Sequence, residues 1–120
     1  MLQLKQPSLE PYWMDLVAGV RLKVRPPSTA LMLMSKNDAH GAIKGDEASS
    51  ETTAKFQVAW GKSLAKAAIV DWEGIGDAGG APAPVTPENI ELLMENYAAF
   101  SAFDREYMTP AMLLDSEKNA

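Results

Sequence analysis

The chain has 120 residues, of which 47% are hydrophobic and 22% are charged, and these fractions exclude wholesale disorder. The absence of cysteine excludes disulfides, thiolate metal sites and cysteine nucleophiles. A net charge of −5 argues against general binding to nucleic acid, whose phosphates require a basic surface. We therefore expect a single domain over residues 1–120 that binds no nucleic acid.

The first predicted element is a β-hairpin over residues 12–25. Val20, Leu22 and Val24 alternate with charged residues, which is the period-two pattern of a strand with one solvated face. Gly19 can adopt the positive φ that a short hairpin loop needs, and Pro26-Pro27 prevents the second strand from continuing. A lone hairpin is only marginally stable, so we expect it to pack on helices.

Residues 28–120 are predicted to be mainly helical. Ser28 is a suitable N-cap for a short helix through Met34. Residues 36–53 are mostly polar and contain Gly41 and Gly45, so we expect a mobile surface loop or a frayed helix there.

The next helix is predicted over about residues 51–72 and has two apolar faces. One stripe contains Phe56, Ala59, Trp60, Leu64, Ala67 and Val70, and the other contains Val58, Ala65, Ile69 and Trp72. A helix that is apolar on two sides is buried on two sides. Either it is the central helix of a small bundle, or one face is reserved for a second chain.

Two further helices are predicted after a Gly/Pro-rich break. Thr86, followed by Pro and Glu, is the expected start of a helix that runs to about Asn96. A second helix begins near Tyr97, and Pro110 must kink or restart it, with Thr109 as a candidate cap. The predicted fold class is therefore α+β, mostly α, with an N-terminal β-hairpin followed by a small bundle of four or five helices.

The sequence contains no convincing motif for catalysis, cofactor binding or metal binding. Residues 74–79 fit the pattern GxGxxG, but a predicted helix precedes them and prolines follow, so we expect a flexible turn. His40 is the single histidine and has no neighbouring metal-ligand motif. We therefore expect no catalytic residues, no cofactor and no metal, and interpret the chain as a binding protein and not an enzyme.

The C-terminal half carries a more specific pattern, in which Asp71-Trp72-Glu73-Gly74 is followed by a Gly/Pro turn and then by Thr86-Pro87-Glu88-Asn89. Together with the Tyr12-Trp13 hairpin, this pattern resembles the tail assembly chaperones of long-tailed bacteriophages and prophages. The resemblance implies a protein that keeps the tape-measure protein soluble while the tail tube polymerises around it. Its expected partner is thus the tape-measure protein or another phage tail protein, with a homo-oligomer also possible.

Two other functions are compatible with the same sequence. The chain could be a virion component, such as a connector or a tail-completion protein, or an interaction domain unrelated to phages. The sequence has neither a run of about 18 apolar residues nor a signal-peptide pattern at its beginning. We therefore expect no membrane association and a location in the cytoplasm of a bacterial host cell.

The candidate partner-binding residues lie near the C-terminal end of the sequence. Residues 71–120 contain ten acidic and two basic residues, which favours a basic partner. The last helix is predicted to carry an aromatic stripe made of Tyr97, Phe100, Phe103, Tyr107 and Leu114. Met108 and Met112 lie beside this stripe, and Leu113 lies further round the helix. The candidates are Tyr107, Met108, Met112 and Leu113. They are predicted either to form a patch for an amphipathic segment of the partner or to be buried in the bundle or in a homodimer.

Overall fold

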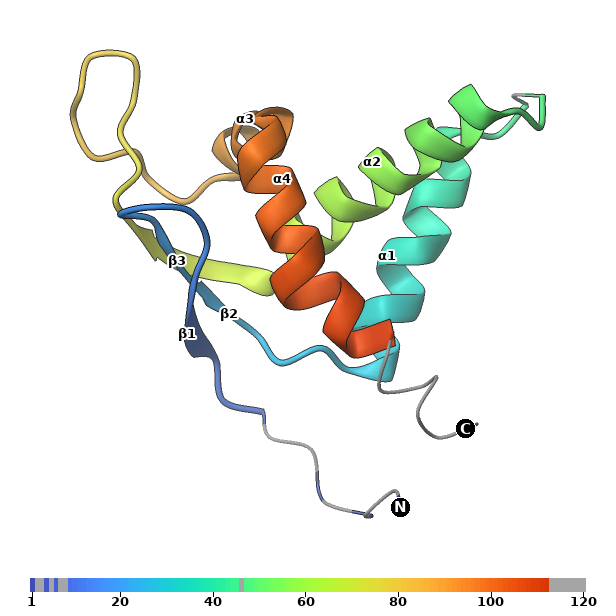
Figure 1. Cartoon of the computed structure of the whole chain (residues 1–120), viewed down its shortest axis with the longest axis horizontal. Helices are drawn as coiled ribbons and strands as arrows, with labels where there is room; N and C mark the ends of the chain where they lie inside the picture. The colour runs from blue at the N-terminus through green and yellow to red at the C-terminus, as the bar shows by residue number, and fades with distance from the viewer. Residues whose placement is uncertain (2–3, 5, 7–8, 46, 113–120) are drawn as a thin grey trace.

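In the described part of the chain, a three-stranded antiparallel sheet is combined with four helices (Figure 1). The computed structural model describes residues 1, 4, 6, 9–45 and 47–112. The strands are β1 (Tyr12–Asp15), β2 (Arg21–Val24) and β3 (Ile69–Glu73), and the helices are α1 (Thr29–Ala42), α2 (Ser50–Ala68), α3 (Pro87–Glu95) and α4 (Tyr97–Phe103). A π-helical turn, η1 (Asp104–Met108), continues α4. The predicted fold class, an N-terminal hairpin followed by a small helical bundle, is confirmed.

The hairpin forms as the alternation predicts. Met14 pairs with Leu22, and Leu22 pairs with Trp72 of β3, so one face of the sheet carries an apolar row. The other face carries Arg21, which bridges Asp15 and Glu73 across the three strands. The apolar row faces the core, where Leu22 is fully buried.

The third strand corrects the prediction that the helix beginning near Glu51 continues to Trp72. The helix ends at Ala68, whose carbonyl oxygen accepts a hydrogen bond from the backbone N–H of Arg25. Ile69, Val70 and Trp72 are β-branched or aromatic residues, which favour a strand when a neighbouring edge is available. The free edge of β2 provides that edge, so tertiary pairing decides the conformation of these residues.

The predicted loop over residues 36–53 is also wrong for most of its length. Helix α1 continues through these polar residues to Ala42, and α2 already begins at Ser50. Ser35 and Ala39 are buried where α1 packs on α2, and this packing stabilises a helix that the composition does not favour. The connection is therefore limited to residues 43–49, of which residue 46 lies outside the described residues.

Side-chain N-caps fix the starts of the helices locally. Ser28 Oγ accepts a hydrogen bond from the N–H of Leu31, and Thr86 Oγ1 accepts one from Asn89. Both caps are confirmed predictions. Asn96 caps α4 in the same way, which places Tyr97 in the first turn, where its side chain is exposed and does not join the predicted aromatic stripe.

Pro110 neither restarts the last helix nor is preceded by a cap. Thr109 has helical dihedral angles, φ −62° and ψ −45°, and its N–H bonds to the carbonyl oxygen of Asp104 in the π-helical turn. The backbone remains helical through Met112. A proline ring normally clashes with the carbonyl four residues earlier, and the wider π turn gives that ring room.

Helix α4 lies between the sheet and the α1–α2 pair (Figure 1). On one side, its π-helical extension reaches the end of β2 through Tyr107, which bonds to Arg25. On the other side, the ring of Phe100 packs directly over Gly61 of α2. The largest fully buried side chains gather around this helix and the sheet, and they are Tyr107, Phe103, Leu22, Leu64, Met108 and Val24. In the described part of the chain, none of the helices is both long and apolar enough to cross a membrane.

Candidate functional site

Two of the four residues of the predicted patch near the end of the last helix are buried. Tyr107 and Met108 are 1% and 0% exposed, so neither side chain can contact a partner while the protein is folded. Met112 is 37% exposed, and Leu113 lies outside the described residues. The interpretation that Tyr107 and Met108 line a partner groove is therefore wrong, and the alternative that the bundle buries them agrees with the structure.

Tyr107 is buried because η1 contacts the end of the hairpin. The Tyr107 hydroxyl donates a hydrogen bond of 2.6 Å to the carbonyl oxygen of Arg25. The Tyr107 ring stacks on Phe103, with the ring centroids 5.0 Å apart. Burial, with a smaller contribution from Tyr12, raises the pKa of the Tyr107 phenol well above its usual value. Tyr107 is thus a structural anchor, and no pattern in the sequence indicates its partner 82 residues away.

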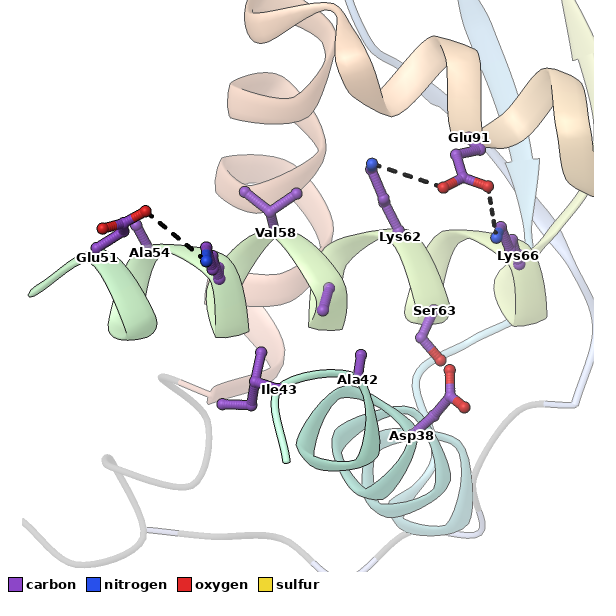
Figure 2. A pocket seen from close by; sticks show the side chains of 12 residues that line it. Asp38, Ala42, Ile43, Glu51, Ala54, Val58, Lys62, Ser63, Lys66 and Glu91 are labelled. Atoms are coloured by element: carbon purple, nitrogen blue, oxygen red, sulfur yellow. Dashed lines mark hydrogen bonds and ion pairs between the residues drawn. The ribbon is translucent and has the colours of Figure 1, made fainter. Parts of the chain in front are cut away.

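An open groove lies instead along one face of α2 (Figure 2), and we call it the α2 groove. It has a volume of about 690 Å³. Its lining comes from α2, from the end of α1 and from Glu91 of α3, and consists of Asp38, Ala42, Ile43, Glu51, Ala54, Lys55, Val58, Ala59, Lys62, Ser63, Lys66 and Glu91. Val58, predicted to lie on a buried stripe, is 39% exposed here. One of the two predicted apolar faces of this helix is therefore left partly open.

Contacts between α1 and α2 set one wall of the groove. The indole Nε1 of Trp60 donates a hydrogen bond of 3.0 Å to Ser35 Oγ. Further along α1, the imidazole of His40 packs on Phe56, with ring centroids 4.5 Å apart. These contacts hold the end of α1 beside α2, so that Ala42 and Ile43 stand next to the groove (Figure 2).

Ion pairs with α3 set the opposite wall. Lys62 binds Glu95 and lies 3.6 Å from Glu91, and Lys66 lies 3.1 Å from Glu91. The hydrogen bond from Lys66 is the main reason that the pKa of Glu91 is lowered. The hydrogen bond to Glu95 raises the pKa of Lys62 against the opposing effect of burial. The sequence shows that these lysines share a face of α2, but only the structure shows that α3 neutralises them.

The open end of the groove carries a different charge pattern. Glu51 and Lys55 form an exposed pair with a distance of 3.7 Å. Asp38, on the α1 wall, forms no ion pair or hydrogen bond with any of the residues that the structure describes. The groove therefore has small apolar side chains at its centre, neutralised charges on the α3 side and one carboxylate available on the α1 side.

A second apolar depression lies where the hairpin meets α1. Its lining is rich in proline and aliphatic side chains, and consists of Leu9, Pro11, Arg25, Pro26, Pro27, Ser28, Ala30, Leu31, Met34 and Ala67. Met34 in this lining is 70% exposed, whereas Met108, which was predicted to be a contact residue, is fully buried. Arg25 is the one charged side chain of this lining.

The glycine motif at residues 74–79 forms a turn that its own side chains stabilise. Asp77 Oδ1 accepts hydrogen bonds from the N–H groups of Gly79 and Ala81, and Gly76 pairs with Pro82. Strand β3 precedes the motif, which corrects the expected helix, but α3 does not begin until Pro87. Gly74, with φ +81°, lies so close to Gly19 that a Cβ there would stand 1.9 Å from its carbonyl oxygen. The glycine motif thus allows its turn to pack against the hairpin turn at Gly19.

Among the described residues, no group of three or more histidine, aspartate or glutamate side chains is placed to hold a metal ion. Around the α2 groove, the described lysines and glutamates are paired with one another.

The fold and the α2 groove define a small α+β protein with an open groove along one helix. Its chain matches the family described as YdaY prophage protein over residues 30–119. This match covers most of the chain and includes every residue that lines the α2 groove. The chain therefore belongs to this family of prophage proteins. None of the curated proteins and none of the solved structures matches it.

Proposed function

We propose that this prophage protein is a tail assembly chaperone, which binds the tape-measure protein reversibly in the cytoplasm of the bacterial host. The family gives the prophage setting, and the sequence pattern around Asp71-Trp72-Glu73-Gly74 supports the more specific role. In this proposal the protein acts by binding alone and is not an enzyme.

The observation that carries the proposal is the α2 groove within the family-matched part of the chain. A chaperone for one client needs an accessible apolar surface that does not cause the chaperone itself to aggregate. Val58 and the alanines beside it offer such a surface, and charged residues lie on both sides of it. A net charge of −5 further favours a solution state that remains dispersed.

Co-expression with fragments of the tape-measure protein from the same prophage tests this function. We expect at least one fragment to be soluble with the chaperone and insoluble without it. Equal solubility in both cases would contradict the proposal. Mass spectrometry of purified tails provides a second measurement, because a chaperone is expected to be absent from finished particles and a virion component to be present.

A further inference from the structure

We propose that the α2 groove binds an amphipathic helix of the client whose basic side chain pairs with Asp38. This inference rests on the proposed function and identifies the surface and the class of client segment. The shape of the groove, its backbone environment and its charges each support it.

The shape of the groove matches a helix of about four turns. Its lining residues on α2 run from Glu51 to Lys66, and a rise of 1.5 Å per residue makes this distance about 22 Å. Alanines and a serine occupy several of the lining positions, and small side chains allow a second helix axis to approach to about 8–10 Å. Val58 stands at the middle of this face, where it can contact apolar side chains at positions i, i+3 and i+4 of the client (Figure 2).

The backbone environment favours a helix over an extended peptide. An added strand gains most of its affinity from hydrogen bonds to a free sheet edge. The groove is lined by α1, α2 and α3, whose backbone groups bond mainly within each helix. A client helix satisfies its own backbone groups and needs only side-chain contacts here.

The charges determine which amphipathic helix fits. Lys62 and Lys66 are paired with carboxylates of α3, and Lys55 is paired with Glu51. Among the charged groups of the lining, the carboxylate of Asp38 has no oppositely charged partner in the described residues. It lies in the last part of α1, where the helix dipole adds partial negative charge. An arginine or lysine on the client is complementary to this position.

Binding of overlapping 20-residue peptides from the tape-measure protein to the full chain tests the inference. We expect Val58→Glu to weaken binding of the best peptide at least tenfold, because it places a carboxylate in the apolar centre of the groove. Leu92→Glu is the matched control, because Leu92 is a 68% exposed helical residue outside the groove lining. We expect it to change binding less than twofold. Circular dichroism and thermal unfolding of each variant verify that the fold is intact.

The role of Asp38 has a control that keeps net charge constant. We expect Asp38→Asn to weaken binding about two- to fivefold, as for a partly exposed ion pair. The double variant Asn37→Asp, Asp38→Asn restores the charge but moves it about 100° around α1, away from the groove. We expect it to bind as weakly as Asp38→Asn. Full recovery of binding would show that only the overall charge matters, and would overturn the pairing.

The outcomes separate the inference from the proposed function. If no tape-measure peptide binds the native chain and no fragment is made soluble by it, both fail. If peptides bind but Val58→Glu and Leu92→Glu behave alike, the function stands and the groove is wrong. If light scattering shows that the native chain is a dimer that Val58→Glu dissociates, the occupant of the groove is a second copy, and the inference of a client helix is overturned.

Discussion

The hydroxyl of Tyr107 donates a 2.6 Å hydrogen bond to the carbonyl oxygen of Arg25, and so joins the last helical turn to the end of the N-terminal hairpin. Arg25 is also the residue whose N–H bonds to Ala68 at the end of α2. A single residue after β2 thus connects the sheet, the central helix and the C-terminal helix.

Tyr107→Phe removes this connection and retains the ring. We expect it to lower the free energy of unfolding by about 1–2 kcal/mol, because the carbonyl oxygen of Arg25 is left without its donor. Urea unfolding followed by circular dichroism measures the loss. Tyr97→Phe is the control, since Tyr97 is 84% exposed, and it should change stability by less than about 0.5 kcal/mol. Equal effects of the two substitutions would contradict the anchoring role.

Trp60 is expected to be the most important single side chain for the α1–α2 contact. It is 8% exposed and donates its hydrogen bond to Ser35. Trp60→Ala should cost about 3–5 kcal/mol through the lost burial and the cavity that remains. Trp60→Phe should cost less, because it mainly loses the indole N–H and part of the ring. A cost below about 1 kcal/mol for Trp60→Ala, measured by chemical denaturation, would place this side chain outside the core.

Two helical glycines offer a matched test of helix packing. A Cβ at Gly61 would lie 2.4 Å from the ring of Phe100, whereas a Cβ at Gly41 would meet nothing within 4 Å. We expect Gly61→Ala to destabilise the protein by about 1–3 kcal/mol, because overpacking outweighs the gain in helix propensity. Gly41→Ala should be neutral or stabilise the protein by up to about 1 kcal/mol. Stabilisation by both substitutions in thermal unfolding would show that α2 and α4 do not approach so closely.

The wall of the α2 groove should depend on pH. Because the hydrogen bond from Lys66 lowers the pKa of Glu91 in the folded state, the pair stabilises the protein above the ordinary glutamate pKa of about 4.3. This contribution is lost as the pH falls through the lower folded-state value. The native protein should therefore be more stable than Glu91→Gln at pH 7, and the difference should vanish in acid.

Urea midpoints of the native protein and Glu91→Gln between pH 7 and pH 3 measure this effect. Lys66→Met provides the control background, in which the effect of Glu91→Gln on stability at neutral pH should be reduced. A difference that is the same at pH 3 and pH 7 would mean that Glu91 acts through its packing and not through its charge.

The amino-acid sequence by itself determined the local features of this protein. The hairpin follows from the alternation around Leu22, and the starts of two helices follow from Ser28 and Thr86, because strand patterning and N-caps depend on residues a few positions apart. The α+β class and the absence of cysteine chemistry likewise required no knowledge of long-range contacts.

Only the tertiary structure decided which surfaces are covered. Ile69 and Trp72 fit a helical stripe as well as a strand, and the free edge of β2 selected the strand. Tyr107 and Met108 are residue types that suit a binding patch, but the structure buries both of them. Tyr107 finds its hydrogen-bond partner 82 residues earlier, at Arg25 after the hairpin. Val58 is a residue type typical of a core, yet its side chain is partly exposed in the α2 groove. Burial depends on contacts between distant segments, and periodicity within one helix carries no information about them.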